Sequence, residues 1–186
     1  MDSHTSQQRH KNMAAIKGKD TKPEMIVRRF LWSMGFRYRL NNQRLPGHPD
    51  IVLLKYRTCI FVNGCFWHAH GVGEEKGKEL SGNTITYGEE LMDSECCKIP
   101  HTRREFWVKK ILRNKERDIE VQQKLAKMGW HCITVWECEL KKDKREKTLE
   151  SLAFTLNKIY LDNRTIKYRI PDEKCCIAAE QEPEYK

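Results

Sequence analysis

Two short apolar runs separated by three residues constrain the fold of this 186-residue chain more than any other feature. The runs are residues 50–54 and 58–62, and their spacing predicts a β-hairpin of two buried strands. Apolar positions at helical spacing over residues 102–127 predict a long helix, and residues 130–136 (WHCITVW) predict a third strand after it. This order predicts an α/β fold in which a small mixed central sheet is flanked by helices.

Capping and breaking residues set the expected bounds of the other segments. Asp20, Thr21 and Pro23 predict the start of a helix that stops near Gly35. The long helix has Thr102 and Glu105 at the spacing of a capping box. Its expected inner side carries Phe106, Val108, Ile111, Leu112, Ile119 and Leu125. A short strand at 36–40 and a last helix at 145–161, with Phe154 among its apolar positions, complete the elements.

The chain is expected to form one domain with loose ends. Residues 1–19 are polar and basic and are predicted to be a flexible arm, and residues 166–186 a disordered tail. The single domain is predicted to span residues 20–165, with residues 71–95 as an inserted loop because they are glycine-rich and weakly periodic.

Charge and cysteine content limit the class of partner and the compartment. The net charge of +9 favours a polyanion such as nucleic acid, although a soluble protein can also be basic without such a partner. Five basic residues crowd the long helix and are expected to include phosphate contacts, namely Lys109, Lys110, Arg113, Lys115 and Arg117. We see no secretory signal or membrane-spanning run, so we expect a cytoplasmic protein whose eight cysteines are metal ligands or buried thiols.

Asp50 is a candidate ligand for a hard cation. It follows Pro49 and opens an apolar strand, after a helix that carries Glu24. A carboxylate at this place suits magnesium, and the arrangement is typical of restriction-type nucleases. The acid-x-lysine pair usual on the next strand is missing, since Phe61-Val62-Asn63 stands there. A surface acid at a strand start remains the alternative.

Cysteine and histidine residues at the ends of the predicted strands indicate a zinc site. Cys65, His70 and Cys138 are the favoured ligands, and Cys96-Cys97 lie just before the long helix. Cys59 and Cys132, on apolar strands, are interpreted as small core residues. His68 is either a free base near a nucleophile or an alternative zinc ligand, and the spacing cannot separate these roles.

Four stretches of the chain together resemble the very short patch repair (Vsr-type) DNA mismatch endonucleases. They are KNMAAIKGKDTKPE from Lys11, RLPGHPDIVLLKYRTCIFVNGCFWHAH up to His70, the helix motif EFW…N…RD, and VWEC up to Cys138. The resemblance implies a restriction-endonuclease-like core and strand-specific nicking on the 5′ side of the thymine in a T:G mismatch. Such mismatches arise when 5-methylcytosine deaminates, and the nick starts repair.

The resemblance also implies roles for single residues. Asp50 matches the magnesium-binding aspartate, and Val62 stands where a main-chain carbonyl binds the metal. His68 matches the general base, with Glu24 as an acid that orders metal-bound waters and Asp118 as a further acid near the site. The aromatic residues that wedge into the base stack match Phe66, Trp67 and Trp107, and Met13 matches a residue of the N-terminal arm that inserts from the other groove.

Two departures from the family pattern are visible. Asn63 stands where the family has a second histidine, which weakens a role as proton donor or phosphate contact. The cysteine expected just after His70 is missing, so either Cys96 or Cys97 would complete the structural zinc site beyond the insert.

The expected partner is duplex DNA with a T:G mismatch, bound by a monomer that is nucleoid-associated when on DNA, with mismatch-repair proteins as further candidate partners. Two rival interpretations are a restriction-type endonuclease that cuts matched DNA and a non-enzymatic, zinc-stabilised DNA-binding protein.

Overall fold

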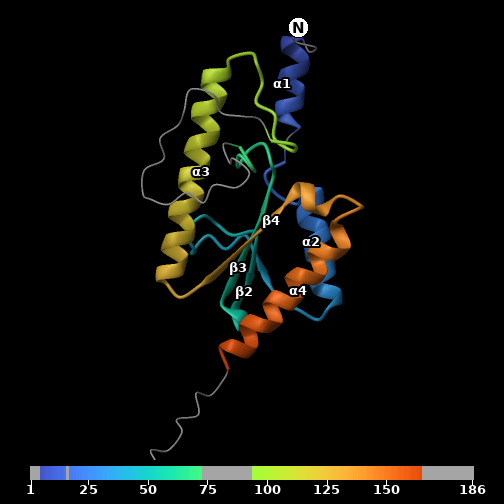
Figure 1. Cartoon of the computed structure of the whole chain (residues 1–186), viewed down its shortest axis with the longest axis vertical. Coiled ribbons are helices and arrows are strands. Elements are labelled where there is room, and N and C mark those ends of the chain that lie inside the picture. Colours follow the sequence, from blue (N-terminus) through green and yellow to red (C-terminus); the bar gives the residue numbers. More distant parts are fainter. Residues whose placement is uncertain (1–4, 16, 73–93, 165–186) are drawn as a thin grey trace, which may run out of the picture.

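A four-stranded mixed sheet with helices on both faces forms the centre of the molecule in the computed structural model, which describes residues 5–15, 17–72 and 94–164 (Figure 1). The strands are β1 (Arg39–Leu40), β2 (Ile51–Leu53), β3 (Thr58–Asn63) and β4 (His131–Trp136), in that spatial order. The helices are α1 (Ser6–Ala14), α2 (Lys22–Ser33), α3 (Arg104–Lys127) and α4 (Arg145–Asp162). The predicted α/β class is confirmed.

The predicted hairpin is the antiparallel pair β2 and β3, in which Ile51 faces Ile60 across the ladder. A 3₁₀ turn over Leu54–Tyr56 joins the strands, and Arg57 closes it in the left-handed region at φ 47°. Because side chains alternate along a strand, Ile51, Leu53 and Ile60 lie on one face of the sheet, and Val52 and Cys59 lie on the other. Both faces are apolar and must therefore be buried by helices.

The third predicted strand, β4, runs parallel to β3, and α3 makes the crossover between them. The register pairs Thr58 with His131 at one end and Asn63 with Trp136 at the other. The carboxyl ends of both strands therefore lie at the same edge of the sheet. In open α/β sheets this edge is where ligands bind.

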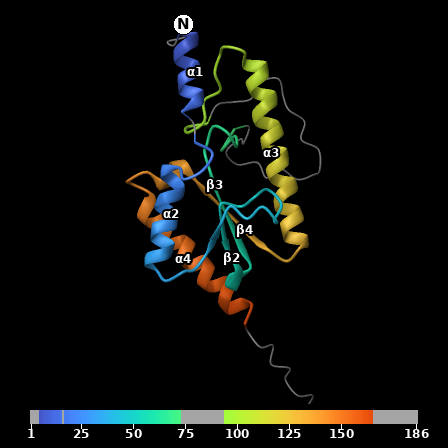
Figure 2. The same ribbon diagram turned by 180° about the vertical axis from the view of Figure 1, so that it is seen from behind.

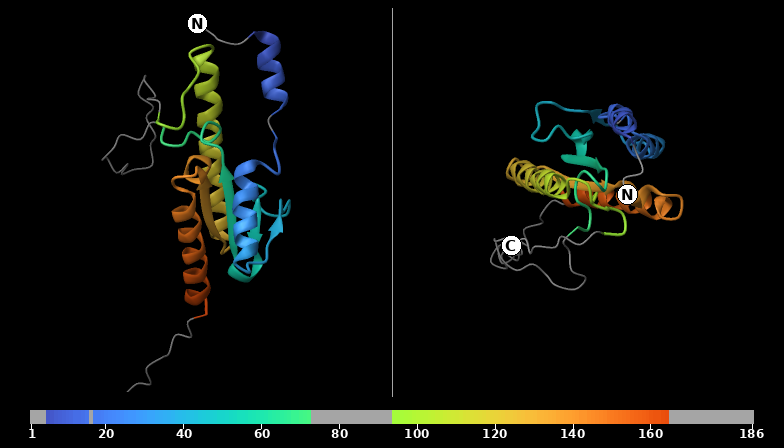
Figure 3. Two further views of the ribbon diagram at one scale, coloured as in Figure 1. Left: turned by 90° about the vertical axis from the view of Figure 1, so that its right-hand side faces the viewer. Right: turned by 90° about the horizontal axis from the view of Figure 1, so that it is seen from above.

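Separate apolar clusters attach the helices to the two faces. Helices α2 and α4 lie side by side against one face, where Leu31 and Leu156 are fully buried with Ile60 (Figure 2). Helix α3 covers the other face through Leu125, which packs with Val52 and Cys59 (Figure 3). Such burial of whole leucine and isoleucine side chains is worth about 1.5–3 kcal/mol each.

The ends and inner faces of the long helices differ in part from the predictions. Helix α3 begins at Arg104 after a left-handed Arg103 (φ 54°) whose side chain makes no capping bond, so the predicted capping box is wrong. Three residues expected inside are exposed, by 55% for Phe106, 40% for Ile119 and 72% for Phe154. Helical spacing identifies the apolar face of a helix, but the elements that pack on this face determine which of its residues are buried.

The N-terminal arm contains a helix that its composition did not indicate. Thr5 caps α1 by accepting a hydrogen bond from the N–H of Gln8 at 3.3 Å. Most of the predicted insert (73–93) and the predicted tail (166–186) lie outside the described residues. In the part that the structure describes, every helix is too short or too polar to cross a membrane.

Candidate active site and metal centre

A cleft of about 860 Å³ opens at the carboxyl ends of β3 and β4. Its wall takes residues from the start of α2, the start of β2, the end of β3 and the middle of α3. Four site residues predicted from the sequence, Glu24, Asp50, His68 and Asp118, all line it. The fold thus gathers groups that are up to 94 positions apart, from Glu24 to Asp118, into one cavity.

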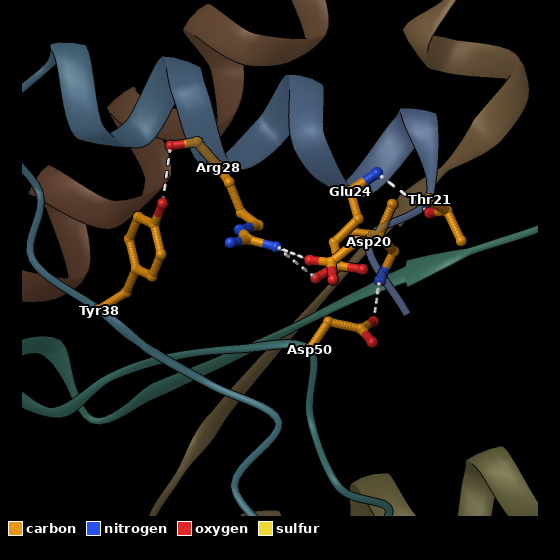
Figure 4. Close-up of polar contacts among 7 residues, drawn as sticks. Asp20, Thr21, Glu24, Arg28, Tyr38 and Asp50 are labelled. Atoms are coloured by element: carbon orange, nitrogen blue, oxygen red, sulfur yellow. Dashed lines mark hydrogen bonds and ion pairs between the residues drawn. The ribbon is translucent and has the colours of Figure 1, made fainter. Parts of the chain in front are cut away.

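Asp50 is held at the mouth of the hairpin by a main-chain hydrogen bond. The N–H of Val62, on β3, donates to its Oδ2 at 2.8 Å, and Figure 4 shows this bond as a dashed line from the labelled Asp50. Burial raises the pKa of Asp50, the Val62 N–H lowers it, and the charge of Glu24 raises it further. A half-buried carboxylate beside a second acid is a favourable place for a cation.

Glu24 lies in the first turn of α2 and is only 3% exposed. Thr21 caps the helix by accepting from the Glu24 N–H at 3.3 Å, as the sequence predicts. The guanidinium of Arg28 donates to Glu24 Oε1 at 3.3 Å and to Asp20 Oδ1 at 2.5 Å (Figure 4). This ion pair compensates part of the cost of burying the Glu24 carboxylate and fixes its position in the cleft.

His68 and Asp118 form a histidine–carboxylate pair. His68 lies in the turns after β3, and its Nδ1 contacts Oδ2 of Asp118 from α3. A carboxylate on Nδ1 holds the proton there and leaves Nε2 as the basic atom of a neutral ring. The chain over residues 65–72 forms a series of turns, so His68 and His70 reach different sites.

His70 belongs to a second, sulfur-rich centre. Its Nδ1 lies 3.7, 3.2 and 3.3 Å from the Sγ atoms of Cys65, Cys96 and Cys138. All four donor atoms lie within 4.8 Å of one another. Three thiols and one imidazole in this arrangement fit a tetrahedral structural zinc ion. Burial raises the pKa of the Cys65 thiol to about 12, so a cation is needed to stabilise its thiolate.

The structure shows which of Cys96 and Cys97 lies with the other thiols, a question that the sequence left open. Cys96 joins the sulfur-rich centre, whereas Cys97 is fully buried in an apolar cluster with Ile99 and Ile111. The side chain of Cys97 is thereby part of the packing under the aromatic residues. Among the described residues Cys59 is also buried, and burial raises its pKa to about 12, as expected for a core thiol.

The sulfur-rich centre is attached to β4 through a ring stack that we did not predict from the sequence. The imidazole of His70 lies parallel to the indole of Trp136, with centroids 4.0 Å apart and planes at 6°. Phe61 and Trp130, by contrast, pack against the apolar cluster under α3. The signal was present in VWEC, where the tryptophan is two residues before a ligand.

An aromatic cluster (Phe66, Trp67, Phe106 and Trp107) stands beside the cleft. Phe66 and Trp107 contact each other edge-on at 5.3 Å and pack on the Cys97 cluster, and Trp67 lines the cleft. Phe106 had been assigned to the core but is exposed and contacts Trp107 at 5.3 Å. Lys110 Nζ lies 5.5 to 5.7 Å from three of the ring centroids, which places a cation over the cluster.

Met13 lies on α1 and is 46% exposed, apart from the residues that line the cleft. Helix α1 projects from the same end of the molecule as the N-terminal half of α3 (Figures 1 and 3). The structure therefore brings the acids and His68 together in the cleft and three thiols and His70 together in the sulfur-rich centre, and leaves Met13 on a separate element.

Known proteins are similar in sequence to this chain over most of its length. Residues 1–74 match the family model described as DNA mismatch endonuclease Vsr. The type II nicking enzyme V.NmeAIP of Neisseria meningitidis is 43% identical over 140 residues, which cover 75% of this chain and 84% of that protein. The DNA mismatch endonuclease Vsr of Escherichia coli is 36% identical over 140 residues, 75% of this chain and 76% of that protein. This chain belongs to the Vsr family of DNA mismatch endonucleases, which have a restriction-endonuclease-like fold.

Proposed function

We propose that the protein nicks one strand of duplex DNA on the 5′ side of the thymine in a T:G mismatch, and so starts repair of deaminated 5-methylcytosine. The observation that carries the proposal is a single cleft that holds the Asp50–Glu24 acids and the His68–Asp118 pair, with Trp67 of the partly buried aromatic cluster in its wall. The relatives are named as a mismatch endonuclease and as nicking enzymes, which supports the same chemistry.

The residues at the mouth of the hairpin fit a magnesium ion. Asp50 would bind it through the carboxylate, with the main-chain carbonyl of Val62 as a second ligand and Glu24 ordering bound waters. Burial and the charge of Glu24 raise the pKa of Asp50. A bound cation would therefore stabilise the ionised carboxylate. When bound, magnesium supplies Lewis-acid stabilisation of the charge on a phosphodiester.

His68 would take the proton from the attacking water. Asp118 orients the ring and stabilises the imidazolium that forms, as carboxylates do in other histidine-based sites. A base positioned in this way contributes about 10²–10⁴-fold in rate. Because His70 completes the metal centre, His68 is left free for this role.

The aromatic cluster would select the mismatch by opening the base stack. Unstacking costs less at a wobble pair than at matched pairs, so inserted rings favour mismatched sites. Phe66, Trp67 and Trp107 would insert from one groove, and Met13 of α1 from the other. Lys110 above the rings adds a positive charge where the backbone of the duplex would pass.

The zinc ion would have a structural role. Cys65, His70, Cys96 and Cys138 provide four ligands, which leaves no open position for substrate. The ion would tie the turns that carry Phe66 and His68 to the end of β4. We further propose that the enzyme works as a monomer on cytoplasmic, nucleoid DNA and that mismatch-repair proteins act after the nick.

The test is nicking of end-labelled duplexes that differ only in one pair, T:G or matched, with magnesium or with EDTA. The proposal predicts one nick, 5′ of the thymine, only with the mismatch and magnesium. Cleavage of matched duplex at a fixed sequence would favour the restriction-type alternative. Binding without cleavage under every divalent cation would favour the non-enzymatic one.

A further inference from the structure

Ser94, the first described residue after position 72, connects the two stretches of chain that form the sulfur-rich centre. Its hydroxyl donates to the main-chain carbonyl of His70 at 2.6 Å and accepts from the main-chain N–H of Cys97 at 3.0 Å. The N–H of Ser94 also donates to the carbonyl of Cys97 at 3.0 Å, which closes a turn over residues 94–97. One side chain thus connects the stretch that ends in His70 with the turn that carries Cys96.

The two stretches approach each other closely at Gly71. This glycine has a φ of 68°, in the left-handed region, and a Cβ added to it would lie 3.1 Å from the Cβ of Ser94. Few Cβ atoms in proteins come so near to another atom, so the absence of a side chain at Gly71 leaves the room that Ser94 occupies. The contact joins residues 24 positions apart and keeps the two parts of the centre together.

The turn directs its two neighbouring cysteines to different places. The Sγ of Cys96 lies 3.2 Å from Nδ1 of His70, whereas the Sγ of Cys97 lies 3.9 Å from the carbonyl oxygen of Phe66 inside an apolar cluster. The Ser94 hydroxyl contacts the main chain of both His70 and Cys97, so it fixes the orientation of the turn relative to the imidazole. This orientation decides which of the two thiols faces the other metal-ligating groups.

We propose that Ser94 is a positioning residue of the zinc site, which selects Cys96 as the ligand and holds it beside His70. The inference rests on the structural zinc ion proposed above and concerns a side chain that does not bind the ion itself. Hydrogen-bonding groups around metal ligands fix the orientation of those ligands, and their loss lowers metal affinity about 10–100-fold. Without the hydroxyl, zinc binding would have to order the turn that carries Cys96, and this ordering costs conformational entropy.

A different role, in which Ser94 only stabilises its own turn, predicts a different result. Ser33 provides the comparison, because its hydroxyl donates to the main-chain carbonyl of Phe30 at 2.8 Å near the end of α2. Ser33→Ala and Ser94→Ala each remove a hydrogen bond from a hydroxyl to a main-chain carbonyl. If both serines only stabilise local structure, neither change alters the zinc affinity of the folded protein. Ser33→Ala is therefore the matched control.

The experiment is a competition for zinc between the full-length protein and a chromogenic chelator, with folding checked by circular dichroism. We expect Ser94→Ala to lower the zinc affinity about 10–100-fold and Ser33→Ala to leave it unchanged. Ser94→Thr keeps the hydroxyl and should restore an affinity close to that of the wild type. Gly71→Ala keeps the hydroxyl but crowds Ser94, so it should also lower the affinity, and it takes the place of Ser94→Ala if that variant does not fold.

The outcomes of the competition separate this inference from the metal centre on which it rests. Equal zinc affinities of Ser94→Ala and Ser33→Ala would overturn the positioning role. An affinity of Ser94→Thr as low as that of Ser94→Ala would also overturn it, because the hydroxyl would then not be the group that acts. If the wild type takes up no zinc, the proposed metal centre fails instead.

Discussion

His68 and Asp118, which are 50 positions apart in the sequence, meet through Nδ1 and Oδ2 in the wall of the cleft. His70, only two residues from His68, points its Nδ1 at three cysteine sulfurs instead. The turns over residues 65–72 thus place one imidazole in the cleft and the other in the sulfur-rich centre. This separation is the basis of the predictions that follow.

His68→Ala is expected to reduce the nicking rate about 10²–10⁴-fold while one zinc ion per chain is retained. Asp118→Asn should also slow nicking strongly, because the amide can donate to Nδ1 and leave the proton on Nε2, the atom that would act as the base. Single-turnover nicking and metal analysis on the same samples measure both effects. His70→Ala is the matched control and should lose zinc; loss of zinc in His68→Ala would show that the two histidines have been assigned the wrong way round.

Asp50→Asn is expected to abolish nicking and yet stabilise the magnesium-free protein. Because the folded-state pKa of Asp50 is raised, mainly by burial, its ionised form costs stability, and this cost grows as pH rises above the unfolded value of 3.8. At pH 7.5 the amide should raise Tm, because it carries no charge to bury. Calorimetry with and without magnesium tests this. Magnesium should raise the Tm of the wild type only, and a lower Tm for Asp50→Asn without magnesium would contradict the account.

Cys96 and Cys97 are expected to respond differently to alanine substitution. Cys96→Ala removes a ligand and should lower the zinc content below one per chain, with a large loss of stability, because structural zinc contributes about 10–16 kcal/mol in small domains. Cys97→Ala removes a weak hydrogen bond from the thiol to the Phe66 carbonyl, at 3.9 Å, and leaves a small cavity, so it should cost about 1 kcal/mol with zinc retained. Zinc titration and urea unfolding compare the pair; the reverse order of zinc contents would disprove the assignment.

Trp67→Ala is expected to weaken binding to a T:G duplex more than binding to matched duplex. The indole lines the cleft and belongs to the aromatic cluster, and loss of a stacked ring costs about 1–3 kcal/mol. Trp32→Ala is a suitable control, because Trp32 is 57% exposed at the far end of α2. Fluorescence anisotropy with both duplexes gives the comparison. An unchanged preference for the mismatch in Trp67→Ala would remove the cluster from recognition.

Elements whose side chains repeat at a fixed period were predictable from the sequence. The hairpin, β4 and the course of α2 follow from apolar runs and from the capping residue Thr21, and the structure has them within a few residues. The start of α3 was not predictable, because Arg103 adopts a left-handed conformation in place of a side-chain cap. The helix α1 carries few apolar residues, so the composition gave no period to detect.

The types of residue in the site could be predicted from the sequence, but which of them contact each other could not. Asp50, His68 and Cys65 could be named from local sequence, since Asp50 directly precedes β2 and the other two lie in the turns that follow β3. The choice of Cys96 over Cys97 depends on how the chain turns back beneath His70, which is a tertiary contact. The Trp136 stack and the exposed position of Phe106 depend in the same way on packing between distant segments.

The most direct test of the account follows both metals at once. Zinc-loaded protein is mixed with a T:G duplex, magnesium is titrated, and nicking is recorded while a chromogenic chelator reports any zinc released. The account predicts that nicking rises from zero with magnesium while one zinc per chain stays bound. Nicking without magnesium, or an intact mismatched duplex at saturating magnesium with zinc fully bound, would contradict it.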